Sequence, residues 1–181
     1  MTTSPKETEA TLNGLHPEKL IGICEMMKQP EVLKGVSGPW KSRVVWQSGF
    51  RTKAYMRKHA IEMDEPGDLD ATDMAASAHE QLLSAIGSCL TVGYVLNATK
   101  RGIRIHDLEI ALEAQFDDIL KWAGSSPDGN PGYRGIHAKI FVRADADDAT
   151  LRELWKAAVD GSPVTQTVMR GTPVTAEFGE L

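Results

Sequence analysis

Residues 77–102 read SAHEQLLSAIGSCLTVGYVLNATKRG, and this stretch decides the fold. Ser77 followed three residues later by Glu80 is the capping-box spacing that begins a helix, and Gly102 is typical of a helix end. The apolar side chains between these signals cover most of the circumference of such a helix: Leu82, Leu83, Ala85, Ile86, Leu90, Val92, Val95, Leu96 and Ala98. A helix that is apolar all round is buried on more than one side. We expect its own sheet on one face and a second subunit on another, with the N-terminal helix as the alternative cover.

The segments before this helix predict one further helix and a hairpin. Pro17 suits a first helical turn, and the apolar spacing predicts a helix over residues 17–28. Residues 40–47 and 50–63 are predicted as two strands joined by a turn at Ser48 and Gly49. The acidic loop at 64–73 lacks the residue spacing of a calcium loop, and we interpret it as a solvated turn.

The segments after the long helix predict two strands, two helices and a last strand. Residues 104–117 and 133–143 alternate apolar with polar side chains, which is typical of half-buried antiparallel strands. Asp148 is predicted to cap a helix that ends at Gly161, and Ser162 followed by Pro163 predicts the start of another. Residues 174–178 are predicted as the final strand. The order indicates an α+β domain over 39–181, preceded by an N-terminal extension over 1–38.

The composition excludes several classes of function. A net charge of −5 argues against nucleic acid or an anionic membrane as the main partner. We find no stretch near the ~20 apolar residues of a membrane span and no basic segment followed by an apolar leader, so we expect a cytoplasmic location. The two cysteines, Cys24 and Cys89, are too few for a disulfide scaffold or a cysteine-rich zinc site. If either cysteine has a functional role, that role depends on the reactivity of its thiol.

The run HEQLLSAIGSCL at 79–90 resembles the central-helix signature of the OsmC/Ohr family, the osmotically inducible and organic hydroperoxide resistance proteins. The resemblance extends over roughly 40–181 and includes KRGI at 100–103, DEP at 64–66 and SPV at 162–164. It implies an OsmC-like fold, with antiparallel sheets around a long central helix, in an intertwined homodimer with two sites at the subunit interface. It also implies reduction of organic hydroperoxides or hydrogen peroxide by a cysteine on that helix. An arginine and a glutamate assist, a second cysteine resolves the sulfenic acid, and thiols supply the electrons without cofactor or metal.

Cys89 matches the cysteine that attacks peroxide in this family. The alternative interpretation is a small buried packing residue, which is the usual role of a free cysteine. Because the thiolate is the nucleophile, another segment must supply a cation. Arg51, beside the Ser48–Gly49 turn, is the first candidate by resemblance. Arg57 is the second candidate, since it lies six residues further along the same predicted strand and would face the same side. The alternative interpretation of each residue is an exposed strand arginine without a role in the site.

Glu80 matches the family's glutamate, although the capping box with Ser77 explains it without catalysis. Nine helical residues correspond to about 13 Å of rise and roughly 180° of rotation, so Glu80 and Cys89 cannot meet on one straight helix. Either the helix is broken between them or Glu80 acts across a dimer interface.

Ser162 occupies the position of the family's second cysteine, and serine cannot form a disulfide. Its remaining role is to cap the following helix. Cys24 is then a candidate resolving thiol, with a buried helix cysteine as the alternative interpretation. Otherwise an external thiol such as glutathione or a dihydrolipoyl group must reduce the sulfenate.

These residues favour thiol-dependent reduction of organic hydroperoxides or hydrogen peroxide through Cys89, in defence against oxidative stress. The alternatives are a binding or redox-sensing protein without turnover, with a ligand pocket at the dimer interface, and a dimeric relative without chemistry. The five histidines show no metal-ligand spacing, and the resemblance implies that the reaction needs neither metal nor organic cofactor.

Overall fold

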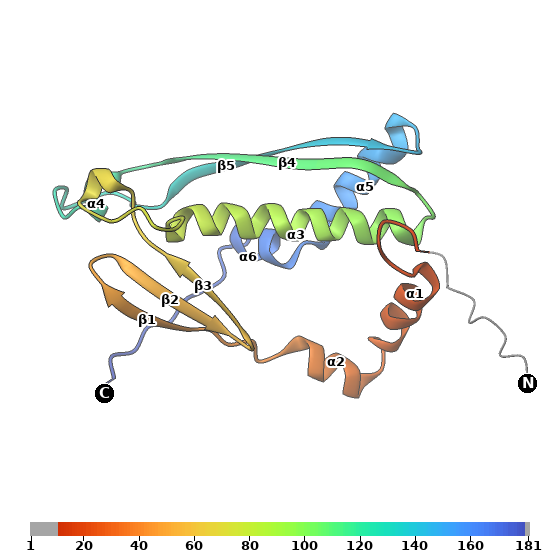
Figure 1. Ribbon diagram of the computed structural model, residues 1–181, viewed down its shortest axis with the longest axis horizontal. Helices are drawn as coiled ribbons and strands as arrows, with labels where there is room; N and C mark the ends of the chain where they lie inside the picture. The colour runs from red at the N-terminus through yellow and green to blue at the C-terminus, as the bar shows by residue number, and fades with distance from the viewer. Residues whose placement is uncertain (1–10, 180–181) are drawn as a thin grey trace, which may run out of the picture. The chain divides into compact units, whose positions relative to one another are not determined.

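The computed structural model describes residues 11–179 (Figure 1). The chain divides into two compact units, one up to Ser84 and one from Ala85 onward, and each is described by itself. The first unit holds two short helices and a small sheet, and the second holds a long hairpin packed against helices.

Two helices open the first unit where the sequence predicted one. α1 runs over Pro17–Met26 and α2 over Pro30–Ser37, and each begins at a proline. The prediction of a single helix over 17–28 was therefore too long and missed α2. Proline fixes a helical φ and needs no hydrogen-bond partner for its nitrogen in a first turn, so Pro30 starts a new helix. Neither helix contains a buried residue.

The small sheet has three antiparallel strands, β1 (Arg43–Ser48), β2 (Arg51–Met56) and β3 (His59–Met63). The β1–β2 hairpin was predicted correctly, and the Trp46 indole Nε1 donates to the Gly49 carbonyl oxygen at 2.8 Å across its turn. The single strand predicted over 50–63 was wrong, because the chain turns at Arg57, whose φ is 53°. That left-handed conformation is a turn conformation and does not continue a strand.

The acidic loop is more ordered than a solvated turn. A short 3₁₀ helix, η1, covers Gly67–Leu69, and Asp64 is only 2% exposed. Its carboxylate accepts hydrogen bonds from the Thr72 hydroxyl and from the backbone N–H groups of Glu65 and Met74. These donors, the Thr72 hydroxyl foremost, hold the pKa of Asp64 below its ordinary value.

The long helix α3 runs without a break over Ala78–Lys100. The Glu80 half of the predicted capping box forms, since the Ser77 backbone N–H donates to Glu80 Oε2 at 2.8 Å. At the other end Gly102, with a φ of 73°, allows the chain to turn out of the helix. Because the helix is continuous, a break between Glu80 and Cys89 is excluded.

The second unit is built on the antiparallel pair β4 (Ile105–Phe116) and β5 (Tyr133–Ala144), which confirms the two predicted strands. Their connection contains a short helix, α4 (Ile119–Trp122), that was not predicted. The partly buried side chains of both strands alternate with exposed ones, and cross-strand pairs such as Ile110 and Ile140 share the inner face.

α5 (Asp148–Gly161) and α6 (Pro163–Met169) follow the hairpin. The cap of α5 is Asp147, whose carboxylate accepts from the Thr150 N–H, so the assignment to Asp148 was off by one residue. The core of this unit joins α3 and α5 to the inner sheet face, and its fully buried members are Tyr94, Ala98, Leu154 and Ala158.

The final strand predicted over 174–178 was wrong for the single chain. These residues have no regular secondary structure, and Val174 and Phe178 are 91% and 96% exposed. Alternation of apolar and polar residues makes a segment suitable for a strand, but a strand also needs a partner edge.

By length and composition α3 is apolar enough to cross a membrane, contrary to our expectation that no stretch approaches a span. A third of its most apolar part is buried inside the protein, and one side packs on α5 and the sheet. A core helix passes the same test, so the observation is weak evidence for a membrane.

Candidate functional site

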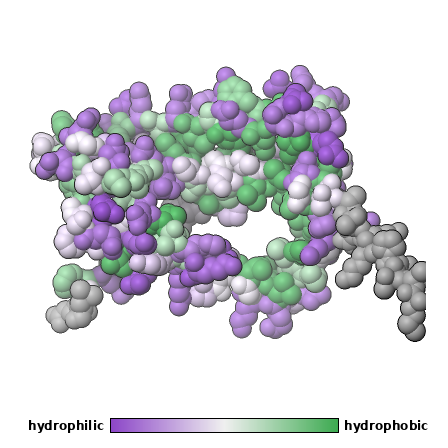
Figure 2. Space-filling view, viewed as in Figure 1, coloured by the Kyte–Doolittle hydropathy of each residue, from purple (hydrophilic) through white to green (hydrophobic). Residues whose placement is uncertain are grey.

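Cys89 lies near the middle of α3 and is partly exposed. With 3.6 residues per turn, Leu82, Ala85 and Val92 fall on the same face of the helix as Cys89. Leu82 is 39% exposed and Val92 is 65% exposed. The thiol therefore stands in an apolar stripe that reaches the surface of the single chain. In Figure 2, residues of intermediate (white) and high (green) hydropathy lie along α3.

Two glycines of α3 mark where the helix comes closest to β4 and to α5. A Cβ at Gly87 would lie 2.7 Å from Leu112 Cδ1, so the helix touches β4 closely at that position. A Cβ at Gly93 would lie 3.4 Å from the Ala158 Cα, which marks the contact with α5. At 100° per residue, Gly87 is turned by roughly 160° from Cys89 and Gly93 by roughly 40°, so β4 contacts the opposite side of α3 and α5 contacts it at the border of the Cys89 stripe.

Ser162 is a structural cap in this chain. It is 1% exposed, and its Oγ accepts from the Thr165 N–H at 3.3 Å and donates to Thr165 Oγ1 at 2.8 Å. Both bonds belong to the first turn of α6. The predicted capping role is confirmed, and the hydroxyl at the position of the family's second cysteine is committed to it.

Glu80 is likewise bound at the start of its helix. Its Oε2 accepts from both the backbone N–H and the hydroxyl of Ser77, each at 2.8 Å. These hydrogen bonds, the backbone one foremost, hold the pKa of Glu80 below its ordinary value. Capping accounts for the position of Glu80, and its role in a reaction stays a prediction.

Arg51 lies at the start of β2 and pairs with the next strand. Its Nη2 is 3.6 Å from Glu62 Oε2, while Lys53 Nζ is 3.1 Å from Glu62 Oε1. Lys53 first, and Arg51 after it, lower the pKa of Glu62. Arg57 lies in the β2–β3 turn and is exposed, so the reason for its candidacy, a shared strand face with Arg51, was wrong.

Cys24 lies in α1 and is partly exposed, like Cys89. Arg51, Arg57, Glu80 and Cys24 belong to the first unit, whereas Cys89 and Ser162 belong to the second. The contacts described above bring Arg51 to Glu62 and Glu80 to Ser77. Within residues 11–179, no three His, Cys, Asp or Glu side chains form a group able to hold a metal ion.

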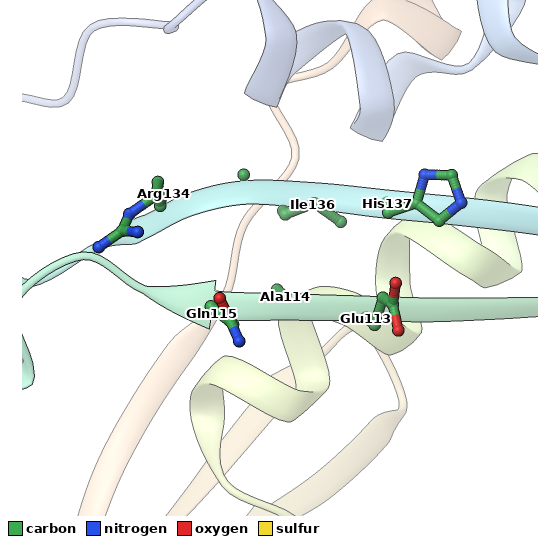
Figure 3. Close-up of a pocket in the computed structure, with 7 residues that line it drawn as sticks. Glu113, Ala114, Gln115, Arg134, Ile136 and His137 are labelled. Atoms are coloured by element: carbon green, nitrogen blue, oxygen red, sulfur yellow. The ribbon is translucent and has the colours of Figure 1, made fainter.

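The larger cavity of the second unit, about 620 Å³, lies over the hairpin (Figure 3). Polar side chains line it, with Glu113 and Gln115 from β4 and Arg134 and His137 from β5. Glu113 and His137 are opposite one another in the register. None of the predicted site residues lines this cavity, and its polar members are exposed.

A second cavity of about 340 Å³ opens beside α3 and was missed by the sequence analysis. Ile86 and Leu90 line it from α3, on a face next to that of Cys89, and Ala138 and Trp155 line it from β5 and α5. The spacing of Ile86 and Leu90 is a local signal for a shared helix face. The convergence of four elements on that face has no such signal in the sequence.

The model of the OsmC family, described as OsmC-like protein, matches residues 71–177, which is more than half of the chain. The chain belongs to the OsmC-like family. No sequence among the curated proteins matches it.

Solved structures of OsmC/Ohr proteins share the fold of this OsmC-like chain. An OsmC-like protein from Mycoplasma pneumoniae is 17% identical, with a TM-score of 0.62 over 73% of this chain and 88% of that one. An organic hydroperoxide resistance protein OsmC from Legionella pneumophila is 10% identical, with a TM-score of 0.53 over 72% and 89%. The organic hydroperoxide resistance protein OhrB of Bacillus subtilis is 17% identical, with a TM-score of 0.50 over 75% and 93%. At these identities the likeness establishes the fold, and it confirms the predicted α+β architecture around a long helix.

Proposed function

We propose that this OsmC-like protein reduces small organic hydroperoxides, and hydrogen peroxide, at Cys89. The observation that carries the proposal is a free, partly exposed thiol on the outward apolar stripe of α3 in a chain of this family. A partly exposed thiol can be reached by a peroxide, whereas a packing cysteine is enclosed. Leu82 and Val92 on either side favour a substrate with a hydrocarbon group.

The reaction at Cys89 is a two-electron transfer from sulfur to peroxide. The thiolate attacks the terminal oxygen of ROOH, and the O–O bond breaks as the S–O bond forms. The products are the cysteine sulfenic acid and the alkoxide RO⁻, which takes up a proton to become the alcohol ROH. Arg51 is our candidate for the cation that stabilises the thiolate and the developing alkoxide. Glu80 is proposed to orient that arginine across an interface between two copies.

A thiol must return the sulfenic acid to the reduced state. It condenses with Cys89–SOH to a disulfide and water, and a second thiol then releases Cys89. Because Ser162 has no sulfur, the first thiol is either Cys24 or an external thiol such as glutathione or a dihydrolipoyl group. Two free thiols in one chain fit a reducing compartment such as the cytoplasm.

The site is proposed to be complete only in a homodimer. The stripe of Leu82, Ala85, Cys89 and Val92 is uncovered in the single chain, and the apolar residues at 174–178 have no strand partner. Both β4 and β5 of the two-stranded sheet also keep an open edge. Exposed apolar surface and open edges are features that a second copy removes.

The experiment is a single-turnover reaction of the reduced protein with cumene hydroperoxide, read by mass spectrometry. We expect one oxidation per chain at Cys89, trapped as the sulfenic acid by dimedone, and its loss in Cys89→Ser. Cys24→Ser is the matched control, because it removes the other thiol and leaves the proposed nucleophile. An unmodified Cys89 after treatment at neutral pH contradicts the proposal.

Ser162 favours a second candidate function, a redox sensor that reacts once. With the Ser162 hydroxyl bound into the cap of α6, the family's resolving step has no sulfur at that position. Steady-state consumption of cumene hydroperoxide with glutathione, dithiothreitol or dihydrolipoamide separates the two functions. An enzyme turns over many times with at least one of them, and a sensor stops after one equivalent.

A further inference from the structure

The cavity of about 340 Å³ in the second unit has walls from four elements. α3 contributes Ile86 and Leu90, which are buried, and β5 contributes Ile136. Val168 and Met169, near the end of α6, stand at the opening, where they are 40% and 68% exposed. The cavity is thus a pit with an apolar floor and an accessible opening.

The lining is almost entirely apolar. Thr165 is its one polar residue, and the Thr165 Oγ1 accepts a hydrogen bond from Ser162, which leaves the Thr165 hydroxyl hydrogen as a donor. No charged side chain lines the cavity among the residues that the structure describes. A charged ligand group would lose its hydration there without gaining a partner, so the lining selects neutral molecules.

The volume fits a small organic molecule. Ligand sites in proteins are commonly about 300–1,000 Å³, and apolar cavities of about 150 Å³ stay dry and accept benzene. A cavity of about 340 Å³ has room for two fused or linked rings or for a short branched chain. A single hydroxyl or carbonyl oxygen on such a molecule could accept from Thr165.

The cavity adjoins the Cys89 stripe, but Cys89, Leu82 and Val92 do not line it. At 100° per residue, Ile86 and Leu90 are turned by roughly 60° and 100° from Cys89 in one direction, and Val92 by roughly 60° in the other, so the cavity lies to one side of the Cys89 stripe. A flat apolar stripe suits a protein partner, and a pit walled by a sheet and three helices suits a small molecule.

We propose that this pit binds a small neutral apolar molecule, at a site in each chain that is distinct from Cys89. Trp155 and Val159 of α5 contact the ligand from one wall, Ala138 from the sheet and Met169 from the opening. Binding does not depend on the thiol, so the site works whether or not Cys89 reduces peroxides.

The test is titration of the full-length protein with N-phenyl-1-naphthylamine, a neutral probe with linked rings whose fluorescence rises in apolar surroundings. Isothermal titration calorimetry gives the stoichiometry. We expect one saturable site per chain. Ala138→Phe fills the pit and should weaken binding by about tenfold or more. Met169→Glu places a charge at the exposed opening without entering the core, and should weaken binding as well.

Ala111→Phe is the matched control, because Ala111 lies on the outer face of the same hairpin, is exposed, and receives the same added ring. It should bind the probe like the unmodified chain, and so should Cys89→Ser. Binding that is absent, or that Ala138→Phe and Met169→Glu leave unchanged, overturns the proposal. It is also overturned if Met169→Glu dissociates the protein to monomers in sedimentation, because a second copy is then the occupant of the pit.

Discussion

The Arg51 guanidinium Nη2 lies 3.6 Å from the Glu62 carboxylate Oε2 on the neighbouring strand. Glu62 also pairs with Lys53, whose Nζ is 3.1 Å from Oε1. Removing either cation leaves the carboxylate with the other, and exposed ion pairs contribute little to stability. The two cations can therefore be removed one at a time without unfolding β2 and β3.

Arg51→Ala should slow the oxidation of Cys89 by cumene hydroperoxide about 100-fold, the scale of losing one group that stabilises developing negative charge. The rate of loss of the free Cys89 thiol measures it. Lys53→Ala is the matched control, because it removes an equal charge that pairs with the same Glu62. Equal effects of the two variants would show that only the net charge of the sheet matters. An unchanged rate in Arg51→Ala would remove Arg51 from the site.

Ser162→Cys should give the chain the family's second thiol. In a Cys24→Ser background, peroxide treatment should convert two thiols per chain to one intramolecular disulfide between Cys89 and the new cysteine, counted by thiol titration and located by peptide mapping. The reduced variant should lose about 1 kcal/mol of stability with the cap of α6. Thr167→Cys, exposed on the same helix, is the control and should form no such bond. A Ser162→Cys chain that keeps two free thiols would contradict the family geometry for this chain.

Helices and strands were predicted correctly where the sequence signal for them lies within a few neighbouring residues. The capping box of Ser77 and Glu80, the alternation of β4 and β5, and Ser162 before Pro163 each act within a few residues, and each gave the observed element. The break at Arg57 was missed because an arginine with a positive φ carries no local signal, unlike glycine. The prediction of a strand over 174–178 was wrong for the opposite reason. The alternating pattern can be read from these residues alone, but the edge with which a strand must pair lies elsewhere in the structure.

Some features of the candidate site could likewise be predicted from the sequence, and others depend on tertiary packing. Family resemblance predicted Cys89 as the nucleophile and Ser162 as the position of the second cysteine, and both stay predictions; the structure adds that Ser162 is bound in a cap. The burial of Asp64 could not be predicted, because its donors Thr72 and Met74 come from further along the loop. The apolar pit depends on α3, β5, α5 and α6 meeting, which only tertiary packing decides.

Ser77→Ala should lower the free energy of unfolding by about 1 kcal/mol, because it removes the hydroxyl that donates to Glu80 Oε2 at the start of α3. Glu80→Gln keeps an acceptor for the Ser77 N–H but loses the charge. The pKa of Glu80 is lowered in the folded chain, so the stability from its charge is present above the ordinary value of 4.5 and is lost as pH falls through the folded value. The gap between the unmodified chain and Glu80→Gln in thermal unfolding should therefore close below pH 4.5. A gap that widens in acid would contradict this origin.

Glu80→Gln also separates capping from catalysis. At pH 7, Glu80→Gln and Ser77→Ala both weaken the cap, but only the first removes the carboxylate. If Glu80 orients Arg51, the Cys89 oxidation rate falls in Glu80→Gln and holds in Ser77→Ala at a temperature where both are folded. Equal rates in both variants would assign Glu80 to the cap alone.

Val92→Asp should dissociate the proposed homodimer. Val92 is 65% exposed on the Cys89 face of α3, so a charge there costs the single chain little, whereas burial of that charge against a second copy is unfavourable. Sedimentation equilibrium should show a dimer for the unmodified chain and about 100-fold weaker association for Val92→Asp. Leu120→Asp, 57% exposed on α4, is the matched control and should remain dimeric. An unmodified chain that sediments as a monomer, or a dimer that Val92→Asp leaves intact, would show that the stripe beside Cys89 is not the interface.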